Sequence, residues 1–303
     1  MRPPAFVIIV LFIFVSSIFI SLKYGNVLAL LTISSDNLQV KRPATQQLKL
    51  GEIASVDLYG SGFDRNFSLN LVKDVTHSEA LVASFPIEGV FNDSLVYNHH
   101  LYLGSNLNGI KVIDLSRPQK PQLKGEYLSG RSIVNIHRKG DQLYLACGRS
   151  GVAIMQIQTD GLLVHVGDIQ TGSTALEVRT VKGLLAVAAG SGGVLLYDIN
   201  QPEEADLISS LDVGASVATI AVYQDLIYVV ARKNNVEIYE FDESCQPLKI
   251  GELLFLSPSK DIKVINGNLY LANASKVFKY DLVDPRHPRL HDTLDNFGSA
   301  DNI

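Results

Sequence analysis

Short apolar runs, many of them alternating with polar residues, recur along the C-terminal two thirds of the chain. Five segments align with one another: LYLGSNLNGIKVIDL, LYLACGRSGVAIMQI, LLAVAAGSGGVLLYDI, LIYVVARKNNVEIYEF and LYLANASKVFKYDL. Tyr102, Tyr144, Tyr228 and Tyr270 mark a spacing of 42 residues, or twice 42 where Ala186 replaces the tyrosine. A fixed period of this length indicates a repeat protein made of short strands.

Other apolar positions keep the same register. One set is Ile136, Val178, Ile220 and Ile262, and another is Ile110, Val152, Val194, Val236 and, one residue early, Val277. Each unit contains three such runs, and a fourth lies around residues 122–128 of the first unit. Because four strands in about 42 residues is the size of a propeller blade, we predict an all-β chain that forms a β-propeller of about five four-stranded blades.

Turn residues occupy fixed places between the predicted strands. Gly109, Gly151 and Gly193 fall between the second and third strands, where a tight hairpin favours a positive φ, and Asn235 stands there in the fourth unit. Prolines follow the third strand and should end it, because proline has no backbone N–H to donate. The paired prolines are Pro118 with Pro121 and Pro285 with Pro288.

The repeats resemble the LVIVD-repeat family of bacterial and archaeal surface proteins. The resemblance rests on GIKVID at residues 109–114 and on a D-x-x-x-P-x-x-P sequence that begins at Asp114 and again at Asp281. It covers residues 87–303, and Gln156 and Glu240 depart from it at the aspartate position. This resemblance implies a propeller at the cell surface.

The N-terminus carries an apolar segment at residues 5–22, with Arg2 before it and Lys23 after it. Eighteen residues of helix rise about 27 Å, close to the thickness of a bilayer core. We predict a single transmembrane signal anchor with the propeller on the extracytoplasmic side. The alternatives are a cleaved signal peptide and a second membrane contact through residues 27–33.

Two further expectations concern the flanks of the repeats. Residues 41–79 form a short β segment, and within it residues 53–71 are similar to the opening of an immunoglobulin-like TIG or IPT module through a G-x-G-F turn. Residues 80–86 lie 42 before the fourth strand at 122–128, so we expect them to complete a C-terminal blade and close the ring. The propeller domain, residues 80–303, then breaks off in a sixth unit, which suggests a gene fragment.

Composition narrows the possible partners and chemistry. The formal net charge of −5 argues against nucleic acid, which requires clustered Lys and Arg. Cys147 and Cys245 are 98 positions apart, and we expect both to be free thiols. The sequence contains no nucleophile elbow, P-loop, C-x-x-C or H-E-x-x-H. We therefore predict no catalytic residues, no cofactor and no metal, although a site built from His99 and His100 with partners from other blades stays open.

These features favour a membrane-anchored, non-catalytic binding or scaffold module whose partner is an envelope protein or a polysaccharide. A basic binding face is one hypothesis, formed by residues in loops at one end of the blades. Its members are Arg131, Arg149, Arg232, Lys233 and Lys260. The alternative is a propeller hydrolase, lyase or quinoprotein-like oxidoreductase with a site at the central channel. We expect mainly Ile, Val, Leu and Ala along that channel, which counts against an enzyme.

Overall fold

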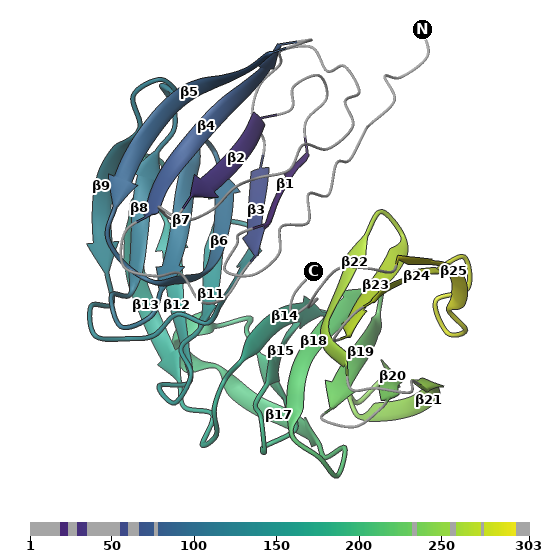
Figure 1. Ribbon diagram of the computed structural model, residues 1–303. Helices are drawn as coiled ribbons and strands as arrows, with labels where there is room; N and C mark the ends of the chain where they lie inside the picture. The colour runs from purple at the N-terminus through teal and green to yellow at the C-terminus, as the bar shows by residue number, and fades with distance from the viewer. Residues whose placement is uncertain are drawn as a thin grey trace, which may run out of the picture. The chain divides into compact units, whose positions relative to one another are not determined.

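The computed structural model describes residues 19–23, 29–34, 55–59, 67–75, 78–231, 235–254, 259–273 and 276–294. The chain divides into two compact units, the first made of residues 1–133 and 157–163 and the second of residues 134–156 and 164–303. Both units consist of antiparallel β-sheets (Figure 1). The predicted all-β fold is confirmed as a propeller of five four-stranded antiparallel blades.

Each blade is built from four strands that follow one another in the chain. Blade 1 contains β6 (Phe91–Tyr97), β7 (His100–Ser105), β8 (Ile110–Asp114) and β9 (Gln122–Tyr127). Blade 2 contains β10 (Asn135–Lys139), β11 (Gln142–Ala146), β12 (Val152–Ile157) and β13 (Leu163–Ile169). Blade 3 contains β14 (Glu177–Val181), β15 (Leu184–Ala188), β16 (Val194–Asp198) and β17 (Asp206–Leu211), with the 3-10 helix η1 (Pro202–Glu204) before β17. Blade 4 contains β18 (Val217–Tyr223), β19 (Leu226–Ala231), β20 (Asn235–Phe241) and β21 (Pro247–Leu254). Blade 5 contains β22 (Ser259–Ile265), β23 (Asn268–Asn273), β24 (Val277–Asp281) and β25 (Arg289–Leu294).

The middle strands of blades 3 and 4 are apolar on both sides because each of these blades packs between two neighbours. β15 (LLAVA) and β19 (LIYVVA) are buried along their whole length. One apolar cluster joins blade 3 to blade 4 through residues such as Ala186, Leu196, Ile220 and Tyr239. Equivalent clusters join blade 2 to blade 3 and blade 4 to blade 5, so burial between sheets holds the blades together.

Tyrosines of the repeat also connect blades through hydrogen bonds. The Tyr228 hydroxyl on β19 donates to the carbonyl oxygen of Pro285 in blade 5, at 2.6 Å. In the first unit, the Tyr102 hydroxyl on β7 donates to the carbonyl oxygen of Gly161 at 2.9 Å. Tyr102 and Tyr228 therefore pack their rings in the core and reach a turn far along the chain with their polar ends, whereas the hydroxyl of Tyr144 donates to Gln142 on its own strand.

The three predicted turn glycines lie against the fourth strand of their own blade. Gly109, Gly151 and Gly193 have φ values of +67°, +75° and +76°. A Cβ atom at Gly151 would overlap the carbonyl oxygen of Ile169, and one at Gly193 would overlap that of Leu211. These positions need glycine both for its φ and for the close approach of two backbones.

The prolines lie where strands end or begin a turn. Pro118 and Pro121 stand between β8 and β9, and Pro285 and Pro288 between β24 and β25. Pro121 is buried and the other three are half-buried or exposed. Neither pair falls inside a strand, as the missing backbone donor of proline requires.

The strands before blade 1 differ from expectation. Residues 80–86 belong to β5 (Ser78–Ile87), which pairs with β4 (Phe67–Val75) and not with a C-terminal blade. β4 is also paired with β2 (Ala29–Ser34), giving a three-stranded sheet. The physical reason is proximity: only two residues separate β4 from β5, so their pairing has a small loop-closure cost.

The sheet of blade 1 is wider than four strands. β3 (Ser55–Tyr59) pairs with β6, and β1 (Phe19–Lys23) pairs with β3. β3 and β4, the two strands of the TIG-like segment, thus belong to different sheets, and the turn between them lies outside the described residues. The last residues of the predicted anchor form β1, while residues 5–18 lie outside the described part of the chain.

Within the described residues, the structure contains no helix with the length and apolar character needed to cross a bilayer.

The turn glycines generate a test of the fold. Gly151→Ala should lower the free energy of unfolding by about 3 kcal/mol or more, because it combines a left-handed φ with a backbone overlap. Gly172→Ala is the matched control: Gly172 has a φ of +64° with no atom within 4 Å of its added Cβ, so it should cost about 1 kcal/mol. Chemical denaturation of both variants measures the difference, and equal losses would contradict the close approach.

Candidate functional site

The first strands of blades 2 to 5 lie side by side and carry a set of buried polar residues. These residues recur every 42 positions as Asn135 on β10, Glu177 on β14, Thr219 on β18 and Asp261 on β22, with 5–7% of their surface exposed. The expectation that these strands would carry mainly aliphatic residues was wrong. Ile136, Val178, Ile220 and Ile262 pack into the core, whereas the residue before each of them is polar.

Two of these side chains bind the backbone of the following blade. Asn135 Oδ1 accepts a hydrogen bond from the N–H of Val178 at 3.1 Å. Glu177 Oε2 accepts one from the N–H of Ile220 at 3.0 Å. The inner edge of β14 and that of β18 each leave an N–H without a strand partner, and the preceding blade supplies the acceptor.

Glu177 is the centre of a buried charge network. Its carboxylate accepts from the guanidinium of Arg179, from the hydroxyl of Thr219 and, at 3.0 Å, from Nζ of Lys263. Burial alone would raise the pKa of Glu177, but Arg179 and Lys263 outweigh it and lower the pKa from 4.5 to about 2. The carboxylate is therefore ionised at neutral pH although it is inaccessible to water.

Lys263 connects two blades that are not sequence neighbours. Its ammonium group lies 3.0 Å from Glu177 on β14 and 3.5 Å from Asp261 on its own strand β22. The corresponding position on the intervening strand β18 is Ala221, whose methyl group is too short to fill this space. Burial lowers the pKa of Lys263, but Asp261 and Glu177 raise it above its usual value. The ammonium group of Lys263 therefore stays charged beside the carboxylate of Glu177.

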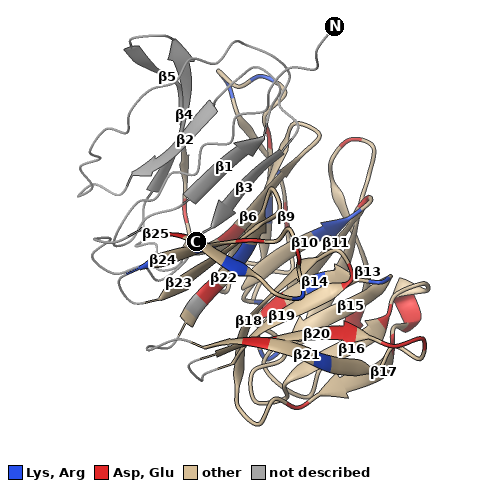
Figure 2. Ribbon diagram, turned by 90° about the vertical axis from the view of Figure 1, so that its right-hand side faces the viewer, with Lys and Arg blue, Asp and Glu red and all other residues tan. Residues whose placement is uncertain are grey.

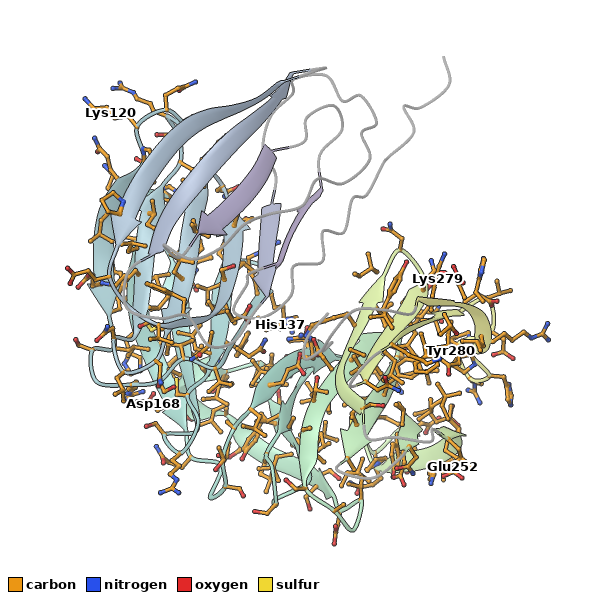
Figure 3. The ribbon with its side chains drawn as sticks, in the orientation of Figure 1. Lys120, His137, Asp168, Glu252, Lys279 and Tyr280 are labelled. Atoms are coloured by element: carbon orange, nitrogen blue, oxygen red, sulfur yellow. The ribbon has the colours of Figure 1, made fainter. Side chains whose placement is uncertain are left out.

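His137 extends the network to blade 2. It lies on β10 at the position that Arg179 and Lys263 occupy in blades 3 and 5 (Figure 3). Its Nε2 accepts from the N–H of Thr180 at 3.2 Å and lies 3.0 Å from the Thr180 hydroxyl. Burial, reinforced by the positive charge of Arg179, lowers the pKa of His137 from 6.5 to about 3, so the imidazole is neutral.

The network balances its own charges, with Glu177 and Asp261 opposite Arg179 and Lys263. Acidic and basic segments accordingly occur together on the inner strands in Figure 2. A general acid or base works best with a pKa near the working pH. The pKa values of Glu177 and His137 lie well below neutral pH and that of Lys263 is raised, so these side chains join neighbouring blades while keeping fixed protonation states near neutral pH.

The five basic residues predicted for a binding face have different places in the structure. Arg131 is half-buried between β9 and β10 in the first unit, and Arg149 is exposed in the turn between β11 and β12 in the second. Arg232 and Lys233 lie outside the described residues, and Lys260 is on β22 with its side chain also outside them. A basic ring thus stays a prediction from the sequence.

His100 and His287, which lie outside the network, contact neighbouring protein groups. His100 Nδ1 lies 2.8 Å from the carbonyl oxygen of Asn98, and the exposed His287 pairs with Asp284 at 2.9 Å. Nowhere among the described residues do three His, Cys, Asp or Glu side chains gather as a metal site would require. Cys147 and Cys245 are both free thiols.

Removing the central carboxylate should destabilise the propeller strongly. Glu177→Gln removes the carboxylate that Arg179 and Lys263 share and leaves Lys263 with Asp261 as an acidic partner, so we expect a loss of about 3–5 kcal/mol in the free energy of unfolding. The control is Glu252→Gln, which breaks the exposed pair of Glu252 with Lys249 and should cost under about 1 kcal/mol. Comparable losses in the two variants, measured by urea denaturation, would contradict a central role for Glu177.

The neutral state of His137 predicts a pH dependence of stability. The unfolded chain takes up a proton near pH 6.5, whereas the folded chain does so only near pH 3, so the free energy of unfolding should fall as the pH drops through this window. The slope should stay below about 1.4 kcal/mol per pH unit, because one imidazole takes up one proton. His137→Gln should flatten the curve between pH 6.5 and 5, while the exposed His291→Gln should keep it. A parental slope in His137→Gln would show that other groups cause it.

Comparison with solved structures supports the fold. The chain is similar to a protein from Lactobacillus plantarum, with 12% identity and a TM-score of 0.62 over 78% of this chain and 80% of that one. A functionally unknown protein from Desulfotomaculum acetoxidans is 13% identical, with a TM-score of 0.63 over 95% and 94% of the two chains. A computationally designed protein is 14% identical, with a TM-score of 0.63 over 98% and 89%. No family model and no curated protein matches the sequence. At these identities the similarity shows a shared fold.

Proposed function

We propose that the chain is a non-catalytic binding or scaffold module of the cell envelope, in which the propeller presents a rigid surface to a partner. The observation that carries this proposal is the charge network around Glu177. Its buried polar groups bind one another and the backbone of adjacent blades, so the inner edge serves the rigidity of the frame. Rigid elements that position exposed loops are typical of binding proteins.

An enzyme with a site at the channel is the weaker alternative. Such a site needs groups that bind substrate or exchange protons, and the residues best placed for this are already engaged. Glu177 accepts hydrogen bonds from four partners, and His137 is neutral with its Nε2 facing Thr180. A substrate would have to displace these contacts at the cost of leaving buried charges unpaired.

The location and partner follow from the sequence features. Residues 5–22 support an anchor in the membrane, and the LVIVD-like repeats support a position outside the cytoplasm. The net charge of −5 disfavours nucleic acid and leaves an envelope protein or a polysaccharide as the partner class. The exposed turns between the second and third strands of the blades offer contact points, such as the turn with Arg149.

Site-specific photo-cross-linking of the full chain in intact envelopes of its host tests this proposal. A photoreactive residue at Arg149 or Ser191, both exposed in turns between second and third strands, should give a discrete cross-linked product. The control position is Asp225, exposed in a turn at the opposite end of β18. The purified product should then bind the purified chain. Absence of a product at every tested position of the blade surface would contradict a binding role.

A further inference from the structure

Tyr102 and Tyr228 each hold the turn that precedes the fourth strand of the next blade. The hydroxyl of Tyr228 in blade 4 donates to the carbonyl oxygen of Pro285, and that of Tyr102 in blade 1 donates to the carbonyl oxygen of Gly161. Both tyrosines are fully buried. Each of these turns is therefore fixed by a ring that cannot move without disturbing the packed core.

Blade 3 has no such tyrosine, because Ala186 occupies its position. The turn before the fourth strand of blade 4 is bound by the exposed Lys182, which lies between β14 and β15. Nζ of Lys182 donates to the carbonyl oxygen of Phe241 at 2.9 Å. The two residues are 59 positions apart, the same separation as between Tyr102 and Gly161. A lysine at the surface thus replaces, between blades 3 and 4, the buried phenol of the other two junctions.

Two further contacts attach blade 3 to the same turn. The hydroxyl of Ser209 on β17 donates to Oε1 of Gln246 at 3.1 Å. The half-buried Cys245 packs against the apolar cluster that blades 3 and 4 share. Residues 241–246 belong to blade 4 but are held by blade 3, and we call this segment the strap.

The strap also has hydrogen bonds of its own. The N–H of Asp242 donates to the carbonyl oxygen of Gln246 at 3.1 Å. The carboxylate of Asp242 accepts from the N–H groups of Ser244 and Gln246, at 2.8 Å each. These bonds close the turn without help from blade 3. The strap can therefore keep its shape when its contacts with blade 3 break.

We propose that the strap is a releasable link between blades 3 and 4, which Lys182 holds closed and whose opening exposes Cys245 without unfolding either blade. The links made by Tyr102 and Tyr228 cannot open in this way, because their hydroxyls are carried on buried rings. Lys182 can exchange the carbonyl oxygen of Phe241 for water, since its flexible stem keeps the ammonium group in contact with solvent. Exposed hydrogen bonds and few buried apolar contacts characterise segments that open locally. This conformational device is independent of the binding role proposed above.

Thiol labelling of the full chain measures the opening. Cys245 lies in the strap, and Cys147 is replaced by alanine so that it does not react. An aromatic disulfide reagent should then modify Cys245 about tenfold faster in Lys182→Met than in the parent, because methionine keeps most of the stem and loses the charged donor. Lys182→Arg should keep the parental rate, because the guanidinium group can still donate. The matched control is Lys139→Met, which removes a lysine bond of 3.4 Å from blade 2 to the carbonyl oxygen of Gly183 in blade 3, and it should also keep the parental rate.

Urea separates the opening of the strap from unfolding of the propeller. Local opening exposes little surface, so low concentrations of urea should leave the labelling rate nearly unchanged. A rate that rises steeply with urea would show that Cys245 reacts only after global unfolding and would overturn the proposal. An unchanged rate in Lys182→Met would overturn it as well, as would an equal increase in Lys139→Met.

Discussion

The structure depends on how the innermost strands of the blades satisfy buried polar groups that have no partner within their own sheet. In blades 2 to 5 the inner strand is paired on one side only, so its other edge presents N–H groups to the interior. Asn135 and Glu177 supply acceptors to Val178 and Ile220 of the next blade. The carboxylate that does this in blade 3 is itself buried, and it therefore requires Arg179 and Lys263. One unpaired edge thus leads to a network of charges across three blades.

The repeat makes this solution possible because equivalent residues meet equivalent surroundings. A polar residue at this point of the 42-residue unit is buried in each of blades 2 to 5, and in blades 2 and 3 it accepts a hydrogen bond from the backbone of the next blade. The chemistry can then vary from blade to blade, as Asn135, Glu177, Thr219 and Asp261 do. Variation has one limit: a charge in one blade must be matched in another, and Lys263 meets Glu177 only where Ala221 leaves the space between them.

The blades could be predicted from the sequence because tyrosines, glycines and aliphatic residues recur in one register. The buried network could not be predicted in the same way, although its residues share the 42-residue spacing. Aliphatic positions such as Ile136 and Ile220 dominate the hydropathy pattern of the inner strands, and a pattern does not say that the intervening Asn135 and Thr219 are also buried. A search for polar residues at the repeat period would have found them. The pairing of β5 with β4 was missed because residues 80–86 fit the 42-residue register, whereas the strand that they pair with is their neighbour in sequence.

The same frame explains how a strained turn can persist in blade 1. A left-handed leucine is stable only if its neighbours fix the backbone more firmly than the strain distorts it. The bonds from Asn106 to Val90 and from Gly130 to Leu107 attach the turn to two other segments of the first unit. Glycine at Gly148 and Gly190 achieves the same turn without strain. Blade 1 therefore holds with two backbone hydrogen bonds a turn that blades 2 and 3 form with a glycine.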